Sequence, residues 1–219
     1  VNLPFEDDFE NGLDNWLQRG SPAHRSEMFE GHGGNIAGTY SEINGDARGS
    51  FIACLFEPTE GIELSTWFNM EQYGRGDNPG SWGAGTPGSV NIGEFEGPGL
   101  LVGVNNDGRV RWINGHDYDN YFSDVQLELN TWYQYHIKYH NTKLYVVVKN
   151  ENGDVLIDGY AEVPDYNVNY IQLGAYCLSN PGWVFWDDVE LAEWEPPHGV
   201  INVPDDYNRI QLAIDASED

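Results

Sequence analysis

Apolar and polar residues alternate over most of this chain with a period of two, which is the pattern of strands that have one buried and one solvated face. The alternation is clearest at 62–70, where Ile62, Leu64, Thr66, Phe68 and Met70 share one face, and Glu63, Ser65, Trp67 and Asn69 share the other. It recurs at 133–140 and 144–148, and again from Val155 after the turn sequence NENGD. Three adjoining strands of this kind predict a meander, which needs a second sheet over its apolar face.

Short strands separated by turn residues are expected along all of residues 1–194. The segment 74–89, GRGDNPGSWGAGTPGS, contains too much glycine and proline for a strand and is expected to be a long loop. About a dozen strands without a long helix predict an all-β domain, built as an antiparallel two-sheet β-sandwich of the jelly-roll type.

The pattern changes after Trp194. Residues 195–199 begin with Glu-Pro-Pro and are expected to be a stiff linker. Residues 200–219 predict a short C-terminal helix, capped by Asp205 or Asp206, with Ile210 and Ile214 in its apolar stripe. A single short helix has nothing of its own to pack against, so we expect this tail to be the start of a truncated second domain.

The formal net charge of -26 excludes partners that are themselves polyanions, such as nucleic acid, and leaves neutral sugars and cations as candidates. The longest apolar runs fall short of the 18 residues that a membrane span needs, so none is predicted. Cys54 and Cys177 lie in apolar runs and are expected to be buried free thiols. A bridge between them, which would suit an extracellular domain, stays open.

Aromatic rings and planar polar side chains are the groups that would recognise a sugar, because the C–H face of a pyranose packs on a ring while its hydroxyls need hydrogen-bond partners. The candidates are Trp67, Asn69, Trp82, Glu94, Glu96, Trp112, Tyr170, Gln172, Tyr176 and Trp183, with Arg109 and Arg111 as further polar groups. We rank Trp67, Trp82 and Tyr176 first, because their strand parity or loop position directs them away from the core. The alternative is that these rings belong to the core of the sandwich, as most tryptophans do.

The opening DDF-x-NGLDNW and the ending WDDVEL resemble the concanavalin A-like lectin/glucanase superfamily, including its laminin-G-like sugar-binding modules and its laminarinase and lichenase hydrolases. The resemblance covers residues 4–194 and implies two curved sheets with sugar bound on the concave one. The tail INVPDDYNRIQLAIDA resembles the start of parallel β-helix proteins of the pectate-lyase type. It implies an accessory module of a longer extracellular or cell-surface protein, with a β-helix domain downstream.

Hydrolases of the resembling superfamily carry Glu-x-Asp-x-Glu followed by Phe on a catalytic strand. Laid onto VNIGEFEG, that motif places the acid/base on Glu94 but the nucleophile on Val90 and the assisting aspartate on Ile92. Retaining hydrolysis needs two carboxyl groups, and Val90 supplies none. The sequence therefore predicts a non-catalytic carbohydrate-binding module. Two alternatives stay open: a divergent glycoside hydrolase or polysaccharide lyase that uses Glu94 and Glu96, and a structural or adhesion domain that binds no sugar.

The resemblance also implies one structural calcium ion where the first and last strands meet. Calcium takes carboxylate and carbonyl oxygens as ligands. The matching positions are Asp8, through its backbone carbonyl, and Asp187, through its side chain. A third ligand would be a loop carbonyl near Gly34, which no motif identifies. The alternative is that these are ordinary acidic residues of an acidic protein.

Overall fold

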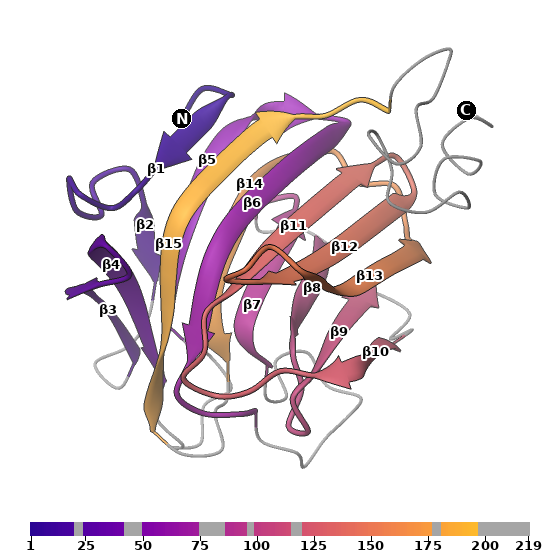
Figure 1. The fold of residues 1–219 in the computed structure, drawn as a ribbon. Coiled ribbons are helices and arrows are strands. Elements are labelled where there is room, and N and C mark those ends of the chain that lie inside the picture. Colours follow the sequence, from indigo (N-terminus) through magenta and orange to yellow (C-terminus); the bar gives the residue numbers. More distant parts are fainter. Residues whose placement is uncertain are drawn as a thin grey trace.

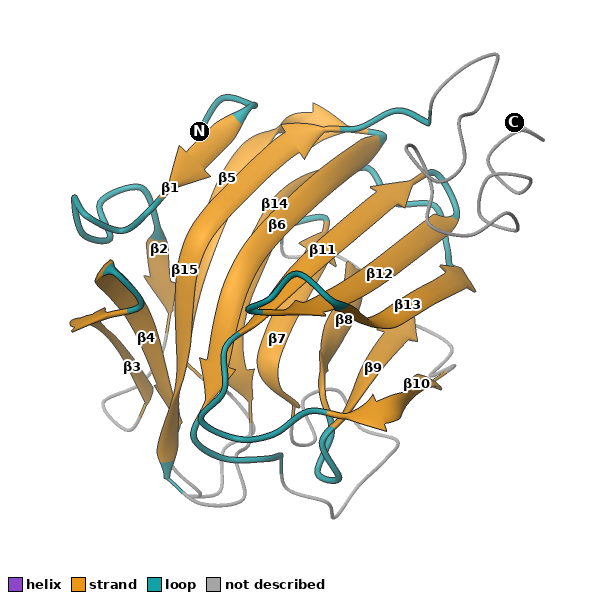
Figure 2. Ribbon diagram, in the orientation of Figure 1, coloured by secondary structure: helices purple, strands orange, loops and turns teal. Residues whose placement is uncertain are grey.

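The computed structural model describes residues 1–19, 24–41, 50–74, 86–95, 99–114, 120–176 and 181–196. All regular elements within these ranges are strands (Figure 2), which confirms the all-β prediction. The strands are β1 (Phe5–Asp7), β2 (Leu17–Arg19), β3 (His24–Gly31), β4 (Gly34–Ser41), β5 (Ser50–Thr59), β6 (Gly61–Met70), β7 (Thr86–Gly93), β8 (Gly99–Val104), β9 (Arg109–Asn114), β10 (Asn120–Gln126), β11 (Tyr133–His140), β12 (Lys143–Asn150), β13 (Val155–Glu162), β14 (Val168–Tyr176) and β15 (Gly182–Glu193). In the part of the chain so described, no helix is long and apolar enough to cross a bilayer.

The strands form two antiparallel sheets packed face to face, as predicted (Figure 1). Sheet A has the order β13-β12-β11-β6-β15-β4-β3, with β1 also paired to β15. Sheet B has the order β10-β9-β8-β7-β14-β5-β2. In Figure 1 sheet A faces the viewer and sheet B lies behind it. Each sheet therefore has one face in the core and one outer face on which a ligand could bind.

Strand parity determines which side chains fill the core between the sheets. The inward residues of β6, from Ile62 to Met70 in steps of two, are completely inaccessible to solvent, whereas Trp67 and Asn69 on the other side of the strand are half-buried. The same alternation holds along β11, where Tyr135, Ile137 and Tyr139 are fully buried. The period-two pattern of the sequence therefore predicts the inward face of these strands correctly.

The predicted meander is β11-β12-β13, and both of its turns use backbone conformations that the sequence favours. Asn141 has a φ of 52° and Gly153 a φ of 83°, values that asparagine and glycine adopt more readily than other residues. The Asn150 side chain stabilises the second turn, because its Oδ1 accepts hydrogen bonds from the backbone N–H groups of Asn152 and Asp154.

Strand β15 changes its neighbour partway along its length. Its first half, from Gly182 to Trp186, pairs with β4, and its second half, from Val189 to Leu191, pairs with β1. The register with β6 on the opposite side also shifts between Asp187 and Glu190, and Asp188 takes a φ of 46°. Asp187 and Asp188 therefore lie where the sheet ladder is interrupted. Asp187 keeps the outward parity of Trp183 and Phe185, and the irregularity leaves Asp188 exposed directly after it.

Cys54 is a free thiol in the core, and burial raises its pKa to about 11. An inert, packed thiol was the expectation from its apolar surroundings. Cys177, residues 197–199 of the expected linker and the whole of the expected cap helix at 200–219 lie outside the described residues.

Candidate functional site

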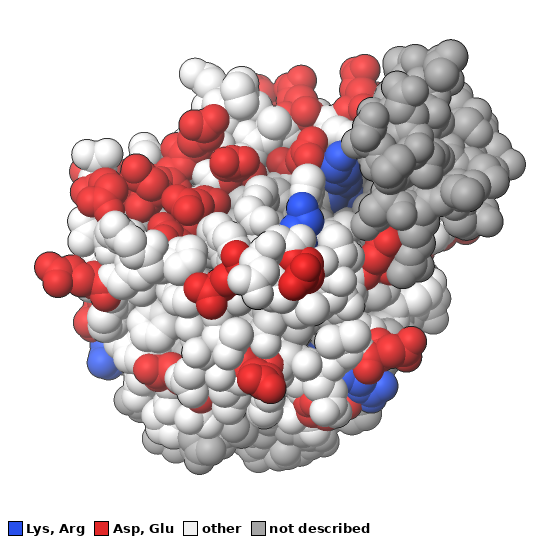
Figure 3. All heavy atoms as spheres, in the orientation of Figure 1, with Lys and Arg blue, Asp and Glu red and all other residues white. Residues whose placement is uncertain are grey.

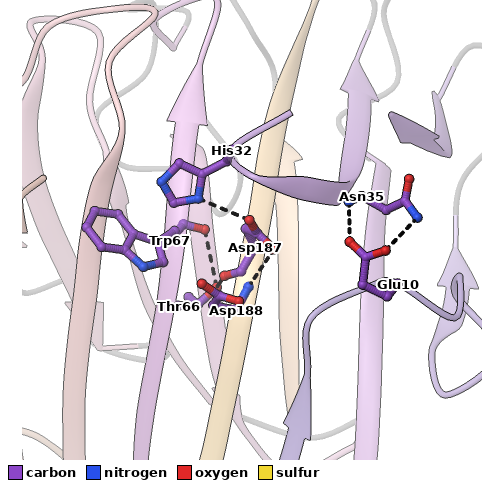
Figure 4. A network of polar contacts seen from close by, with 7 residues as sticks. All are labelled: Glu10, His32, Asn35, Thr66, Trp67, Asp187 and Asp188. Carbon is purple, nitrogen blue, oxygen red and sulfur yellow. Dashed lines mark hydrogen bonds and ion pairs between the residues drawn. The ribbon is translucent and has the colours of Figure 1, made fainter. Parts of the chain in front are cut away.

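The buried carboxylate of Asp187 lies at the centre of a polar network on the outer face of sheet A (Figure 4). Its Oδ2 is 3.0 Å from His32 Nδ1, and its Oδ1 accepts a hydrogen bond of 2.9 Å from the Asp188 backbone N–H. Thr66 Oγ1 donates to the Asp187 carbonyl oxygen at 3.0 Å. Burial raises the pKa of Asp187 above its ordinary value, and the hydrogen bond from His32 opposes that rise.

The imidazole of His32 is held in place by two tryptophans from other parts of the chain. His32 lies in the turn between β3 and β4 with a φ of 43°. Its ring stacks on Trp132 with a centroid distance of 4.3 Å and an interplanar angle of 26°, and it lies 5.1 Å from the Trp67 ring. Packing on both rings restricts the orientation in which His32 presents Nδ1 to Asp187.

Acidic hollows lie on either side of this network. One, of about 270 Å³, is lined by Glu6, Asp7, Asp8, Asp188, Val189 and Glu190. The other, of about 430 Å³, lies along the β3–β4 turn and includes His32 and Gly34 in its lining. Figure 3 shows acidic side chains gathered over the part of this face where β1 and β15 meet. The local field therefore attracts cations.

The side chains that gather here fit calcium poorly. Calcium prefers oxygen ligands, whereas the side chain that contacts the Asp187 carboxylate is an imidazole. The Asp8 carboxylate accepts a hydrogen bond of 3.1 Å from the Glu10 backbone N–H. Calcium would need the Asp8 carbonyl and a carbonyl near Gly34 for most of its shell, and His32 would have to release Asp187.

Several outward positions of sheet B are occupied by glycine. Gly93, Gly99, Gly103 and Gly174 alternate with core residues on β7, β8 and β14, so each stands at an outward position that carries no side chain. A Cβ at Gly174 would lie 2.9 Å from the Ser50 carbonyl oxygen. Glycine within a strand commonly marks a place where another group approaches the backbone closely.

Polar side chains occupy other outward positions of sheet B. Asn91, Gln172 and Arg111 all lie at outward positions of sheet B and are nevertheless buried, at 3 %, 7 % and 1 % exposure. Asn91 and Gln172 are direct neighbours on β7 and β14, and Tyr170 stands half-buried beside them. Within the part of the chain that the structure describes, Asn91 Nδ2 has no hydrogen-bond partner. A buried donor without a partner is rare and calls for an explanation.

Aromatic rings cover one half of the outer face of sheet A, on β3, β4 and β15. Trp183 is in contact with Phe29 at a centroid distance of 4.7 Å and with Tyr40 at 4.9 Å. Phe185 packs edge-on against Phe29 at 5.3 Å, and the Arg25 guanidinium lies 4.5 Å above the Tyr40 ring. These rings are half-buried and pack mainly on one another.

The predicted sugar-binding residues do not share one surface. Trp67, Asn69 and Trp183 lie on the outer face of sheet A, whereas Tyr170 and Gln172 lie on the outer face of sheet B. Trp112 faces the core and is 6 % exposed, with its ring over Gly159 of β13, so the expectation that it faces a ligand needs correction. Trp82, Glu96 and the side chain of Tyr176 lie outside the described residues.

The catalytic motif does not fit the structure at its expected register. Val90 and Ile92, which would replace the nucleophile and the assisting aspartate, are completely buried in the core. The outward positions of β7 carry Ser89, Asn91 and Gly93 instead, and none of these is a carboxylate. Glu94 follows the strand and is half-buried.

Sequence reasoning missed several of the residues that shape these surfaces. Phe185 alternates with Trp183 and could have been found from strand parity. His32 and Trp132 could not, because they approach Asp187 and Trp67 only through the fold. Asn91 lies on β7, the strand of the expected hydrolase motif, and its outward parity follows from the inward Val90 and Ile92.

An ion-pair cluster on the same face of sheet A should make stability depend on pH. The hydrogen bond from His136 lowers the pKa of Glu63, burial opposes this, and the charge of Lys138 Nζ, 3.4 Å away, adds to the lowering. A carboxyl group whose pKa is lowered on folding stabilises the protein above its ordinary pKa of 4.5, and this contribution disappears as the pH falls below that value. The effect is small because the pair is in contact with water.

We therefore expect the wild-type protein to melt at a higher temperature than Glu63→Gln at pH 6, and the difference to shrink as the pH falls below 4.5. Thermal unfolding of both proteins across this range measures it. A difference that stays constant with pH would show that Glu63 stabilises the protein by packing rather than by charge.

Comparisons with known proteins identify the fold but no family. No family model and no curated protein matches the sequence. Among solved structures, the cellulose-induced protein Cip1 is 13 % identical with a TM-score of 0.65, covering 89 % of this chain and 100 % of its own. The lectin UEA-II in complex with galactose is 9 % identical with a TM-score of 0.54, covering 87 % and 98 %. An alginate lyase from Klebsiella pneumoniae is 9 % identical with a TM-score of 0.51, covering 78 % and 85 %.

The chain therefore has the same two-sheet β-sandwich fold as these solved structures. Both a lectin and a lyase are built on it, so the fold alone does not decide between binding and catalysis.

Proposed function

We propose that this chain is a non-catalytic carbohydrate-binding domain and that its polysaccharide ligand binds on the outer face of sheet B. The observation that carries the proposal is the buried side-chain amide of Asn91, whose Nδ2 lacks a partner in the described part of the protein. Leaving such a donor unsatisfied costs about 1–3 kcal/mol. A sugar hydroxyl that accepts this hydrogen bond would recover that free energy on binding.

The surroundings of Asn91 suit a sugar. Gln172 lies directly opposite Asn91 on β14, and Arg111 adds a planar polar group at an outward position two strands away on β9. Tyr170 offers an aromatic ring on which the C–H face of a pyranose can pack. This combination of hydrogen-bonding groups and one ring is typical of small-ligand sites.

The aromatic half of sheet A is the weaker candidate for this ligand. The rings of this half already pack on one another, so much of their surface is covered; they are Phe29, Tyr40, Trp183 and Phe185. A sugar on that face would have to compete with these contacts. The outer face of sheet A is therefore the alternative binding surface, and substitutions on the two sheets distinguish it from sheet B.

The side chains of β7, the strand of the expected hydrolase motif, give little support to a catalytic role. Hydrolysis with retention needs two carboxyl groups about 5–5.5 Å apart on the ligand side. Val90 and Ile92 lie in the core, and the outward residues of β7 are Ser89, Asn91 and Gly93. Binding without turnover is therefore the function that this arrangement favours.

The proposal includes a place for the domain in a larger protein. A polysaccharide ligand implies that the domain works outside the cell or at the cell surface. Residues 200–219 would begin the downstream parallel β-helix domain that their sequence resembles, and the sandwich would then anchor that domain to polysaccharide.

A glycan array that covers plant, algal and microbial polysaccharides tests the function directly. We expect the chain to be retained on one class of neutral polysaccharide without releasing soluble sugar. Release of reducing ends or of unsaturated products would instead show a hydrolase or a lyase. No retention on any glycan would leave the structural or adhesion role.

A further inference from the structure

Three metal-binding side chains converge beside the point where β15 changes its neighbour. They are His32 from the β3–β4 turn and Asp187 and Asp188 from β15, and one ligand atom of each lies within 4.8 Å of the others. Figure 4 shows His32 and the two carboxyl groups facing one another. In sequence, His32 and Asp187 are 155 positions apart, so only the fold brings them together.

We propose that His32, Asp187 and Asp188 bind a transition-metal cation such as Zn²⁺, rather than the calcium ion that the superfamily resemblance implies. Zn²⁺ accepts imidazole nitrogen and carboxylate oxygen together, whereas calcium prefers oxygen ligands throughout. The site is independent of the glycan surface, because it lies on the outer face of sheet A and the glycan surface lies on sheet B.

The spacing of the donor atoms is compatible with one shared ion. With metal–ligand bonds of about 2.0–2.1 Å, neighbouring ligand atoms on one ion lie roughly 2.9–3.4 Å apart. His32 Nδ1 and Asp187 Oδ2 are 3.0 Å apart, within that range. Asp188 is exposed, so its carboxylate can rotate onto the ion without disturbing the core.

Groups around the three ligands orient them. Trp132 and Trp67 pack on the imidazole of His32, and Thr66 Oγ1 fixes the backbone of Asp187 through its carbonyl oxygen. Supporting contacts around the ligands typically change the affinity of a metal site by about 10- to 100-fold. The acidic hollow next to Asp188 raises the local concentration of cations.

The test uses the whole chain stripped of metal and then titrated with ZnCl₂ or CaCl₂ at neutral pH. We expect the wild-type protein to retain one Zn²⁺ per chain after dialysis and to melt roughly 5–10 °C higher at 100 times the dissociation constant. Asp188→Asn should weaken Zn²⁺ binding at least tenfold while the protein stays folded, because the residue is exposed and asparagine tolerates its positive φ. His32→Gln should weaken it by more.

His136→Gln is the matched control, because it also removes an imidazole that pairs with a carboxylate on the same sheet face, yet should leave Zn²⁺ binding unchanged. Titration with Cu²⁺ in place of Zn²⁺ gives a second readout. It should quench part of the fluorescence of the eight tryptophans, because Trp67 and Trp132 contact His32.

Three results would overturn the proposal: stabilisation by CaCl₂ but not by ZnCl₂, Zn²⁺ binding that Asp188→Asn and His32→Gln leave intact, or no metal retained at all.

Discussion

Asn91→Leu is expected to weaken binding of the polysaccharide by about 5- to 140-fold, while leaving the unfolding temperature unchanged or raised. The loss follows from removing a buried hydrogen-bond donor that only the ligand satisfies, worth about 1–3 kcal/mol where 1.4 kcal/mol is tenfold in affinity. Stability should not fall, because in the described residues Asn91 Nδ2 has no partner to lose and leucine is of similar size. Binding is measured on the glycan that the array identifies, and stability by thermal unfolding.

Asn69→Leu is the matched control for Asn91→Leu. Asn69 is also an asparagine at an outward strand position, but it lies on sheet A next to Phe185. We expect this variant to bind normally. If Asn91→Leu bound the polysaccharide normally while Asn69→Leu or Trp67→Ala lost binding, the ligand would lie on the outer face of sheet A. That result would refute the site on sheet B.

Trp186→Ala is expected to lower the free energy of unfolding by about 3–5 kcal/mol, as the loss of a fully buried aromatic side chain does. Trp186 is completely inaccessible between the sheets, and its Nε1 donates a hydrogen bond of 3.2 Å to Thr39 Oγ1. The substitution leaves a cavity beside Phe68 and removes the hydrogen bond that the Thr39 hydroxyl accepts, while Thr39 Oγ1 still donates to the Val184 carbonyl oxygen. For a chain of this size the melting temperature should fall by roughly 6–20 °C.

Phe185→Ala, one residue earlier on the same strand, provides the comparison. Phe185 points to the outer face and is only half-buried against Phe29, so its loss should cost less than half as much. Urea denaturation of both variants measures the two free energies and shows from the m-value whether the compactness of the folded state has changed. Equal losses would mean that parity along β15 does not separate core from surface.

Much of the fold could be predicted from local pattern. The inward face of β6, the meander from β11 to β13 and its two turns follow from the alternation and from Asn141 and Gly153. These features depend on neighbours one or two residues away, because side chains alternate across a strand whatever the strand pairs with. Residues 200–219 are the part of the prediction that the described structure does not reach.

The candidate sites could be predicted only in part. Strand parity places Trp67 and Gln172 correctly at outward positions, but it does not reveal that they lie on opposite sheets, because parity carries no information about strand order. Trp112 and Trp67 are both tryptophans within predicted strands, yet Trp112 faces the core. The absence of a side chain at Gly159 makes room there for its ring.

By itself the sequence determined the all-β class, the inward faces of the strong strands and an acidic surface unsuited to polyanions, since each follows from local alternation or from summed charge. Only the tertiary structure decided that Asn91 meets Gln172 across β7 and β14, and that His32 meets Asp187 at a strand junction. The physical reason is that these contacts join strands far apart in the chain, and that which strands become neighbours is determined by the packing of the whole sandwich.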